Sequence, residues 1–168
     1  IFLSSSELQM SRGEPIADTS KVLSSMVDAV VIRNDSHEEL KLFSENSSVP
    51  VINGLTDLFH PCQILADLMT FKEKNEGEIL SKVCWIGDGN NVANSLIICG
   101  ALLDVEVRIA CPKGYEPNPL LINKALKIYG NKGLLKITND PLIAIPGANI
   151  LYTDVWSSMG EENQMEQK

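Results

Sequence analysis

Residues 83–91 read Val83-Cys84-Trp85-Ile86-Gly87-Asp88-Gly89-Asn90-Asn91, an apolar run that leads into a turn of glycine, aspartate and asparagine. Four consecutive apolar residues bounded by such a turn predict a central strand of a parallel sheet, buried on both faces. The turn is expected to join this strand to a helix. The stretch therefore predicts an α/β fold.

The same alternation of strand and helix patterns continues on both sides of this stretch, which predicts parallel-sheet βα lobes. In the strand expected at 105–109, apolar residues alternate with Glu106 and Arg108. This pattern indicates one solvated face or a position near the edge of the sheet. The expected strands are 1–3, 28–32, 49–52, 83–86, 105–109, 134–137 and 149–152.

Proline and glycine mark the helices that are expected between the strands. Asn118 precedes Pro119, and Asp140 precedes Pro141, so each polar side chain can cap a helix that starts at a proline. Gly130 follows the last turn of the first of these helices and predicts its end. Both helix starts and this helix end are therefore expected to lie close to the marked residues.

A longer amphipathic helix is expected over residues 61–74, and a charged run follows it. We place the boundary between two lobes there. The predicted organisation is a first lobe over residues 1–60, an interdomain helix and linker over 61–78, and a second lobe over 79–168.

Composition and charge argue against several classes of partner. The 168 residues carry a formal net charge of −8, and Lys and Arg are scattered, which argues against nucleic-acid binding. No apolar run is long enough to span a membrane and no signal peptide is recognisable, so a cytoplasmic protein is expected. Disulfides and zinc sites are not expected, because no C-x-x-C pair occurs among Cys62, Cys84, Cys99 and Cys111.

Polar residues gather where the expected strands end, which is the edge at which parallel sheets bind ligands. Arg33 follows a strand and can offer a fixed fork of donors to a phosphate or a carbonyl oxygen. His60 precedes Pro61 at a helix start, where backbone N–H groups face outward beside Gln63. These residues predict a site for an anion or a carbonyl group. The structural alternatives are a surface salt bridge for Arg33 and a plain helix cap for His60.

Two further loops offer amides and a carboxylate. The turn at 87–91 does not continue into the full G-x-G-x-x-G spacing, so NAD binding is not expected. Its asparagines suit a zwitterionic small molecule. Asp154 follows another strand and can hold the amine of a cationic substrate, while Ser158 and the backbone around Met159 can cover it. Each loop, taken alone, is equally consistent with an ordinary turn.

Taken in order, these residues resemble the ornithine carbamoyltransferases of the aspartate/ornithine carbamoyltransferase superfamily, over nearly the whole chain. The H-P-x-Q element at 60–63 marks carbamoyltransferases in general, whereas D-G-N-N at 88–91 and S-M-G at 158–160 point to the ornithine branch. The remaining matching residues are Arg12-Gly13-Glu14-Pro15, Asp18-Thr19, Arg33 and Asp154-Val155-Trp156-Ser157.

The resemblance implies a fold and a reaction. One lobe binds carbamoyl phosphate and the other binds ornithine, and a helix joins them. The carbamoyl group moves to the side-chain amine of L-ornithine, giving citrulline and phosphate as in arginine biosynthesis, without a metal or an organic cofactor. Family membership also implies a homotrimer or a multiple of trimers.

The resemblance also assigns residue roles by motif. The carbamoyl phosphate-binding positions are Gln9, Arg33, His60 and Gln63. The ornithine-binding positions are Asn91, Asp154, Ser158 and Met159. His60 and Arg33 are suited to stabilise the oxyanion of a tetrahedral intermediate, and Asp154 is suited to orient the attacking amine, so these three are the expected catalytic residues.

Other motifs of the family are absent from these 168 residues: the S-T-R-T phosphate-binding motif and the H-C-L-P motif. The sequence also starts at Ile1 without a preceding Met and stops in a charged run at Lys168. An internal piece of a longer enzyme is therefore expected, inactive or nearly so by itself, with both lobes incomplete. Two alternatives stay open: a carbamoyltransferase for putrescine or an acylated ornithine, and a catalytically inactive paralogue that binds ornithine.

Overall fold

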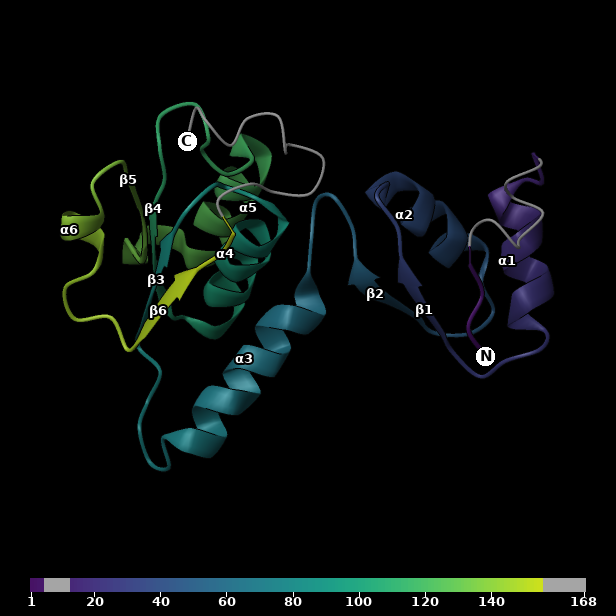
Figure 1. The fold of residues 1–168 in the computed structure, drawn as a ribbon, viewed down its shortest axis with the longest axis horizontal. Helices are drawn as coiled ribbons and strands as arrows, with labels where there is room; N and C mark the ends of the chain where they lie inside the picture. The colour runs from purple at the N-terminus through teal and green to yellow at the C-terminus, as the bar shows by residue number, and fades with distance from the viewer. Residues whose placement is uncertain (5–12, 156–168) are drawn as a thin grey trace. The chain divides into compact units, whose positions relative to one another are not determined.

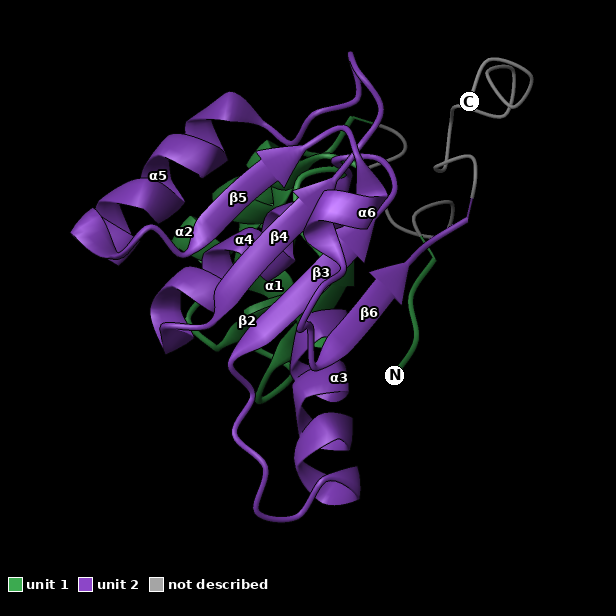
Figure 2. Cartoon of the chain, turned by 90° about the vertical axis from the view of Figure 1, so that its left-hand side faces the viewer, with its two compact units in different colours: residues 1–62 green, residues 63–168 purple. Residues whose placement is uncertain are grey.

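The computed structural model describes residues 1–4 and 13–155, and the chain divides into two compact units, Ile1–Cys62 and Gln63–Lys168 (Figures 1 and 2). Each unit contains one sheet, and every strand pair in the described residues is parallel. The predicted α/β fold with parallel sheets is confirmed. Within the described part of the chain, no helix has both the length and the apolar character needed to cross a membrane.

The described residues of the first unit form a two-stranded sheet and two helices. Strands β1 and β2 are paired from Val30 opposite Val51, and the register shifts after Ile32. The helices α1 and α2 are joined by a hydrogen bond of 2.7 Å from the hydroxyl of buried Ser20 to the carbonyl oxygen of Phe43. The elements are α1 (Ile16–Ser24), β1 (Val30–Arg33), α2 (His37–Asn46) and β2 (Val51–Leu55).

The strand expected at residues 1–3 is wrong. These residues form no strand, and the side chains of Ile1 and Phe2 are exposed, with relative exposures of 109% and 89%. A strand needs a neighbour that takes up its backbone N–H and C=O groups. In the described part of the chain no strand pairs with these residues, so their apolar pattern alone does not make them a strand.

The second unit is built on a four-stranded sheet in the order β5-β4-β3-β6. Helix α3 covers the residues that its amphipathic pattern predicted, and Figure 1 shows it as one unbroken helix. The elements are α3 (Pro61–Lys74), β3 (Lys82–Ile86), α4 (Asn91–Leu103), β4 (Glu106–Ala110), α5 (Pro119–Tyr129), a 3₁₀ turn (Gly130–Lys132), β5 (Leu135–Thr138), α6 (Pro141–Ala144) and β6 (Ile150–Thr153).

Strand β3 is central and buried on both faces, as predicted. Val83 and Trp85 point into the larger core, which α4 and α5 complete with residues such as Ile97. Cys84 points to the opposite face and packs in a small cluster with Ala144 of α6. Figure 2 shows α6 on one face of this sheet and α4 on the other. Because β3 is covered on both faces, its carboxyl end is the place where a polar ligand can approach this strand.

Strand β4 lies next to the edge strand β5, as one interpretation of its alternating pattern predicted. The expected solvated face of this strand is absent, because the side chains of Glu106 and Arg108 are only 16% and 15% exposed and form an ion pair with each other. The Glu106 carboxylate accepts from Arg108 Nε at 2.7 Å and lies 3.1 Å from Lys136 Nζ. Burial opposes the charge of Glu106, but the hydrogen bonds from Arg108 and Lys136 outweigh it and lower the pKa of this carboxyl group.

The helix signals at proline and glycine are confirmed. The side chain of Asn118 accepts a hydrogen bond from the backbone N–H of Leu120, with Pro119 at the first position of α5. Asp140 caps α6 in the same way, and Gly130 ends α5 with a positive φ of 61°. These caps come from local backbone chemistry, so a short window of sequence is enough to predict them.

Candidate functional site

In the first unit, two expected site residues lie at the carboxyl ends of the parallel strands. Arg33 is the last residue of β1, opposite Leu55 at the end of β2, and it is exposed. His60 is half-buried and immediately precedes α3. The sheet therefore delivers a guanidinium group and an imidazole to the same edge, within one unit.

The loop that carries His60 is held by Thr56, whose side chain is fully buried. The backbone N–H of Thr56 donates to the carbonyl oxygen of Phe59 at 2.8 Å, and the N–H of Phe59 donates back to the Thr56 hydroxyl at 3.1 Å. His37 Nδ1 lies 3.2 Å from the same hydroxyl, and its ring packs edge-on against Phe59. This turn fixes the backbone just before His60.

In the second unit, Gly89 allows the loop after β3 to pass against another backbone segment. Its N–H donates to the carbonyl oxygen of Tyr115 at 2.7 Å. A Cβ at this position would lie 2.1 Å from the backbone nitrogen of Pro117, so only glycine fits. Trp85 Nε1 donates to the carbonyl oxygen of Asp88 at 3.0 Å and holds the loop from the core side.

Asn90 joins this loop to the end of β6. Its side-chain oxygen caps α4 by accepting from the N–H groups of Val92 and Ala93 at 3.0 and 3.1 Å. Its amide nitrogen then faces Asp154 and donates to Oδ2 at 2.9 Å. The second oxygen of Asp154 accepts from the N–H of Val155 at 2.7 Å. Asn90 thus orients an exposed carboxylate, a role that the sequence reasoning did not assign to it.

A second set of contacts joins α3 to β6. Gln63 Nε2 donates to both carboxylate oxygens of Asp67, at 3.1 and 3.2 Å. The hydroxyl of Tyr152 donates to Oδ2 of Asp67, and its ring lies 5.3 Å from that of Trp85. Burial, and then the hydrogen bond to the Asp67 carboxylate, raise the pKa of Tyr152. Neither Asp67 nor Tyr152 was among the site residues predicted from the sequence.

Asn94 has a structural role. It is buried, and its side-chain oxygen accepts from the N–H of Asn118 at 3.3 Å, which fixes the start of α5 against α4. Position 92, where G-x-G-x-x-G would place its last glycine, is Val92, which is buried in the core of the unit.

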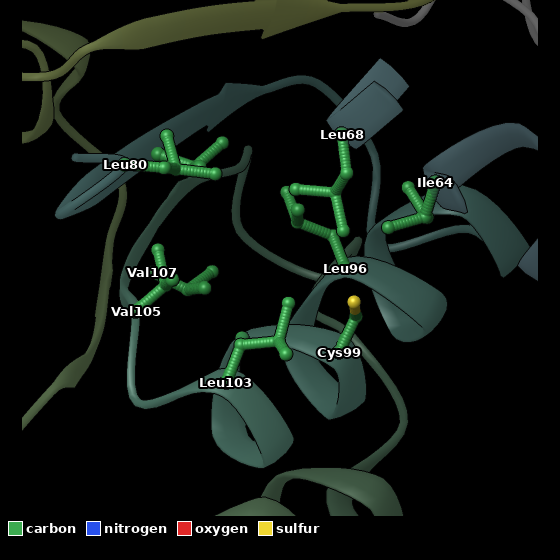
Figure 3. A pocket seen from close by; sticks show the side chains of 10 residues that line it. Ile64, Leu68, Leu80, Leu96, Cys99, Leu103, Val105 and Val107 are labelled. Atoms are coloured by element: carbon green, nitrogen blue, oxygen red, sulfur yellow. The ribbon is translucent and has the colours of Figure 1, made fainter. Parts of the chain in front are cut away.

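The second unit also contains a small apolar pocket between α3, α4 and the amino ends of β3 and β4 (Figure 3). Leu68, Leu96 and Cys99 point into it from the two helices, and burial raises the pKa of the Cys99 thiol. A charged substrate gains nothing from such a lining. Because ligands of parallel sheets bind at the carboxyl ends of the strands, this pocket is a packing feature and not the candidate site.

The structure distributes the expected site residues as follows. Arg33 and His60 belong to the first unit. Gln63, Asn91 and Asp154 belong to the second unit, where Asn91 is the first residue of α4. Gln9, Ser158 and Met159 lie outside the described residues, and their roles stay predictions.

Two family models together cover most of the chain. Residues 1–73 match the carbamoyl-P binding domain of aspartate/ornithine carbamoyltransferases, and residues 81–168 match the Asp/Orn binding domain. An ornithine carbamoyltransferase of Prochlorococcus marinus strain MIT 9312 is 62% identical over 160 residues, which are 95% of this chain and 52% of that protein.

Solved structures agree with the sequence matches. The anabolic ornithine carbamoyltransferase of Campylobacter jejuni aligns with a TM-score of 0.92 at 44% identity, over 100% of this chain and 56% of that one. The enzyme of Pyrococcus furiosus aligns with a TM-score of 0.90 at 45% identity, over 99% and 54%. The chain spans about half the length of the curated relatives that it matches. From both of its domain matches, the chain belongs to the aspartate/ornithine carbamoyltransferase family.

Proposed function

We propose that the complete protein transfers the carbamoyl group of carbamoyl phosphate to the side-chain amine of L-ornithine, giving citrulline and phosphate. The observation that carries this proposal is the Asn90–Asp154 pair at the end of β6. It presents an oriented, exposed carboxylate where a cationic amino acid can meet it, in a chain whose relatives are named ornithine carbamoyltransferases. That carboxylate attracts a cationic acceptor more strongly than an uncharged one, and it repels an anionic one.

On the carbamoyl phosphate side, Arg33, His60, Gln63 and Gln9 are the proposed binding residues. As the amine attacks the carbonyl carbon, the carbonyl oxygen gains negative charge. A guanidinium group and an imidazole N–H can stabilise this oxyanion by hydrogen bonds that strengthen in the transition state. The turn at Thr56 supports this role for His60, because it fixes the backbone that carries the imidazole.

On the ornithine side, Asn91, Asp154, Ser158 and Met159 are the proposed binding residues. The amine must attack as the neutral form, because only an unprotonated nitrogen has a free electron pair. The new C–N bond forms first, the C–O bond to phosphate breaks as the tetrahedral intermediate collapses, and the proton that the amine loses leaves with the phosphate. Asp154 orients the nitrogen toward the carbonyl carbon, and this positioning is its contribution to the rate.

Three finer points belong to the same proposal. Helix α3 and the linker up to residue 78 join a carbamoyl phosphate lobe, residues 1–60, to an ornithine lobe, residues 79–168. The protein works in the cytoplasm, in arginine biosynthesis, and one relative of known structure is named an anabolic enzyme. It assembles as a homotrimer or a multiple of trimers.

The reaction is tested by offering the complete protein carbamoyl phosphate with equal amounts of ornithine, putrescine and N-acetylornithine, and by identifying the carbamoylated products by mass spectrometry. We expect citrulline as the main product, with kcat/KM for ornithine at least about 100-fold above the others, since a site built for polar groups rejects analogues that lack them. Preference for putrescine or the acylated amine contradicts the proposed acceptor. Binding of ornithine without any product identifies an inactive paralogue.

A further inference from the structure

We propose that Asp67 and Tyr152 are positioning residues, which turn the amide of Gln63 so that its oxygen faces the amino group of carbamoyl phosphate. The inference rests on the proposed function and deepens it, because it names the part of the donor substrate that these residues select. All three residues belong to the second unit, and neither Asp67 nor Tyr152 has a role in the site described so far.

The first step is the geometry on α3. Gln63 and Asp67 lie one helical turn apart, the spacing at which side chains on a helix meet. The amide nitrogen of Gln63 lies 3.1 and 3.2 Å from the two oxygens of Asp67, so the contact is shared by both of them. Gln63 is exposed, and without this contact its side chain would turn freely among several rotamers.

The second step is chemical. A carboxylate accepts hydrogen bonds and cannot donate them, so it must meet the NH₂ end of the Gln63 amide. The oxygen of that amide is then directed away from Asp67 and keeps its capacity to accept. Asp67 therefore fixes the orientation of the Gln63 amide and leaves its oxygen to accept a hydrogen bond from a ligand.

The third step is the anchor of Asp67 itself. Tyr152 donates its hydroxyl proton to Asp67 Oδ2, and its ring packs beside Trp85 in the core of the unit. Burial and the neighbouring carboxylate raise the pKa of Tyr152, so the phenol keeps this proton through the neutral pH range. Asp154 lies two residues after Tyr152. The end of β6 therefore carries one residue proposed to act on the carbamoyl phosphate side and one proposed to act on the ornithine side.

The ligand class follows from the acceptor. An acyl phosphate with an NH₂ group on its carbonyl carbon donates a hydrogen bond to the Gln63 oxygen, whereas acetyl phosphate presents a methyl group of similar size. A site whose acceptor is left without a donor loses the free energy of that hydrogen bond. The arrangement thus selects a carbamoyl group over an acetyl group.

The test is Asp67→Asn in the complete protein, because an asparagine can donate as well as accept and lets the Gln63 amide turn over. We expect KM for carbamoyl phosphate to rise by about 5-fold, the size of one hydrogen bond between neutral groups. Inhibition by acetyl phosphate should stay within about twofold, because this analogue never used the Gln63 oxygen. Glu73→Gln is the matched control: the same acid-to-amide change at an exposed position of the same helix, with no expected effect.

If Asp67→Asn weakens the binding of carbamoyl phosphate and of acetyl phosphate equally, the inference is overturned, because a merely structural role affects both ligands. An unchanged KM for carbamoyl phosphate also overturns it.

Tyr152→Phe is the second variant. It keeps the carboxylate and should give a smaller loss in the same direction, and it serves if Asp67→Asn does not fold. A wild-type protein that makes no citrulline refutes the proposed function itself, and with it this inference. Selective loss in the variants of an active enzyme can only come from the positioning role.

Discussion

Two strand-end loops of this chain carry the candidate chemistry and are held in different ways. In the first unit, the turn before His60 is fixed through its backbone and one buried hydroxyl, on a sheet of two strands. In the second unit, the loop at 87–91 is fixed by a glycine against a neighbouring backbone and by Asn90, which bonds Asp154 directly, on a sheet of four strands.

The two loops differ in which part of the chain they hold in place before a ligand binds: backbone in the first loop and a side chain in the second. The first loop fixes the path of the backbone that leads to His60, through the hydrogen bonds between Thr56 and Phe59. The second fixes the side chain of Asp154, the carboxylate that is proposed to bind ornithine, because both ends of the Asn90 amide form hydrogen bonds. A preorganised side chain pays less entropy when the ligand binds, so changes in the second loop should affect ornithine more than changes in the first affect carbamoyl phosphate.

The largest effect is expected from Gly89→Ala. A Cβ would lie 2.1 Å from the Pro117 nitrogen, so the backbone must move, and we expect the free energy of unfolding to fall by about 3 kcal/mol. Denaturant unfolding measures this loss. Gly114→Ala is the control: its φ is +88° but a Cβ there meets no atom within 4 Å, so only the backbone strain of about 1 kcal/mol applies. Equal losses in the two variants contradict the close approach at Gly89.

The next effect is expected from Asn90→Ala, which removes a helix cap and the donor to Asp154 together. Unfolding free energy should fall by about 1 kcal/mol for the cap. KM for ornithine should also rise by about 10-fold, since Asp154 loses its fixed orientation. Asn118→Ala removes a comparable cap from α5, leaves the Asn90–Asp154 hydrogen bond in place, and should lower stability alone. A similar rise of the ornithine KM in both variants would show that the cap, and not the Asp154 contact, matters.

A smaller effect is expected in the first unit from Thr56→Val, which keeps the shape of the side chain and removes its hydroxyl. The N–H of Phe59 loses its acceptor, at a cost of about 1 kcal/mol in unfolding free energy. KM for carbamoyl phosphate should rise by a few-fold at most while KM for ornithine stays the same, as kinetics with each substrate varied in turn will show. A larger change in the ornithine KM than in the carbamoyl phosphate KM contradicts the separation of roles.

The smallest effect is expected on the thermal unfolding midpoint as the pH is raised, because this midpoint should not change near neutral pH. Burial raises the pKa of both Tyr129 and Tyr152, and the hydroxyl of Tyr129 donates to the carbonyl oxygen of Val105 at 2.6 Å. A folded pKa above the unfolded value of about 10 gives stability that is complete below pH 10 and is lost as the pH rises further. Thermal unfolding should show a midpoint that is level near pH 8 and falls above about pH 9, where the partly buried thiol of Cys99, whose pKa is also raised, adds to the effect of the two phenols. Tyr129→Phe should flatten that fall, and an unchanged profile contradicts the role of this phenol.

Local signals in the sequence were sufficient for much of the fold. The central position of β3, the extent of α3 and the caps at Asn118 and Asp140 each depend on a few neighbouring residues, and all were predicted. The apolar residues 1–3 were wrongly assigned to a strand, because a strand depends on a partner that no local pattern can supply.

The candidate site was predictable only in part, for the same reason. Asp154 was found because it follows a strand, but its partner Asn90 lies 64 residues earlier in the chain. The Gln63–Asp67 pair has the spacing of one helical turn and could have been noticed in the sequence. The contact of Asp67 with Tyr152, across 85 residues, depends on where α3 and β6 lie in the folded unit.

The most direct test of this account is Asp154→Asn in the complete protein, with carbamoyl transfer measured while each substrate is varied in turn. Asparagine keeps the shape and removes the charge that is proposed to hold the amine. We predict a loss of at least about 100-fold in kcat/KM for ornithine, as for truncating one partner of a charge pair, with KM for carbamoyl phosphate changed by no more than about twofold. Unchanged ornithine kinetics, or an equal loss for both substrates, would contradict the assignment of the ornithine side to this strand end.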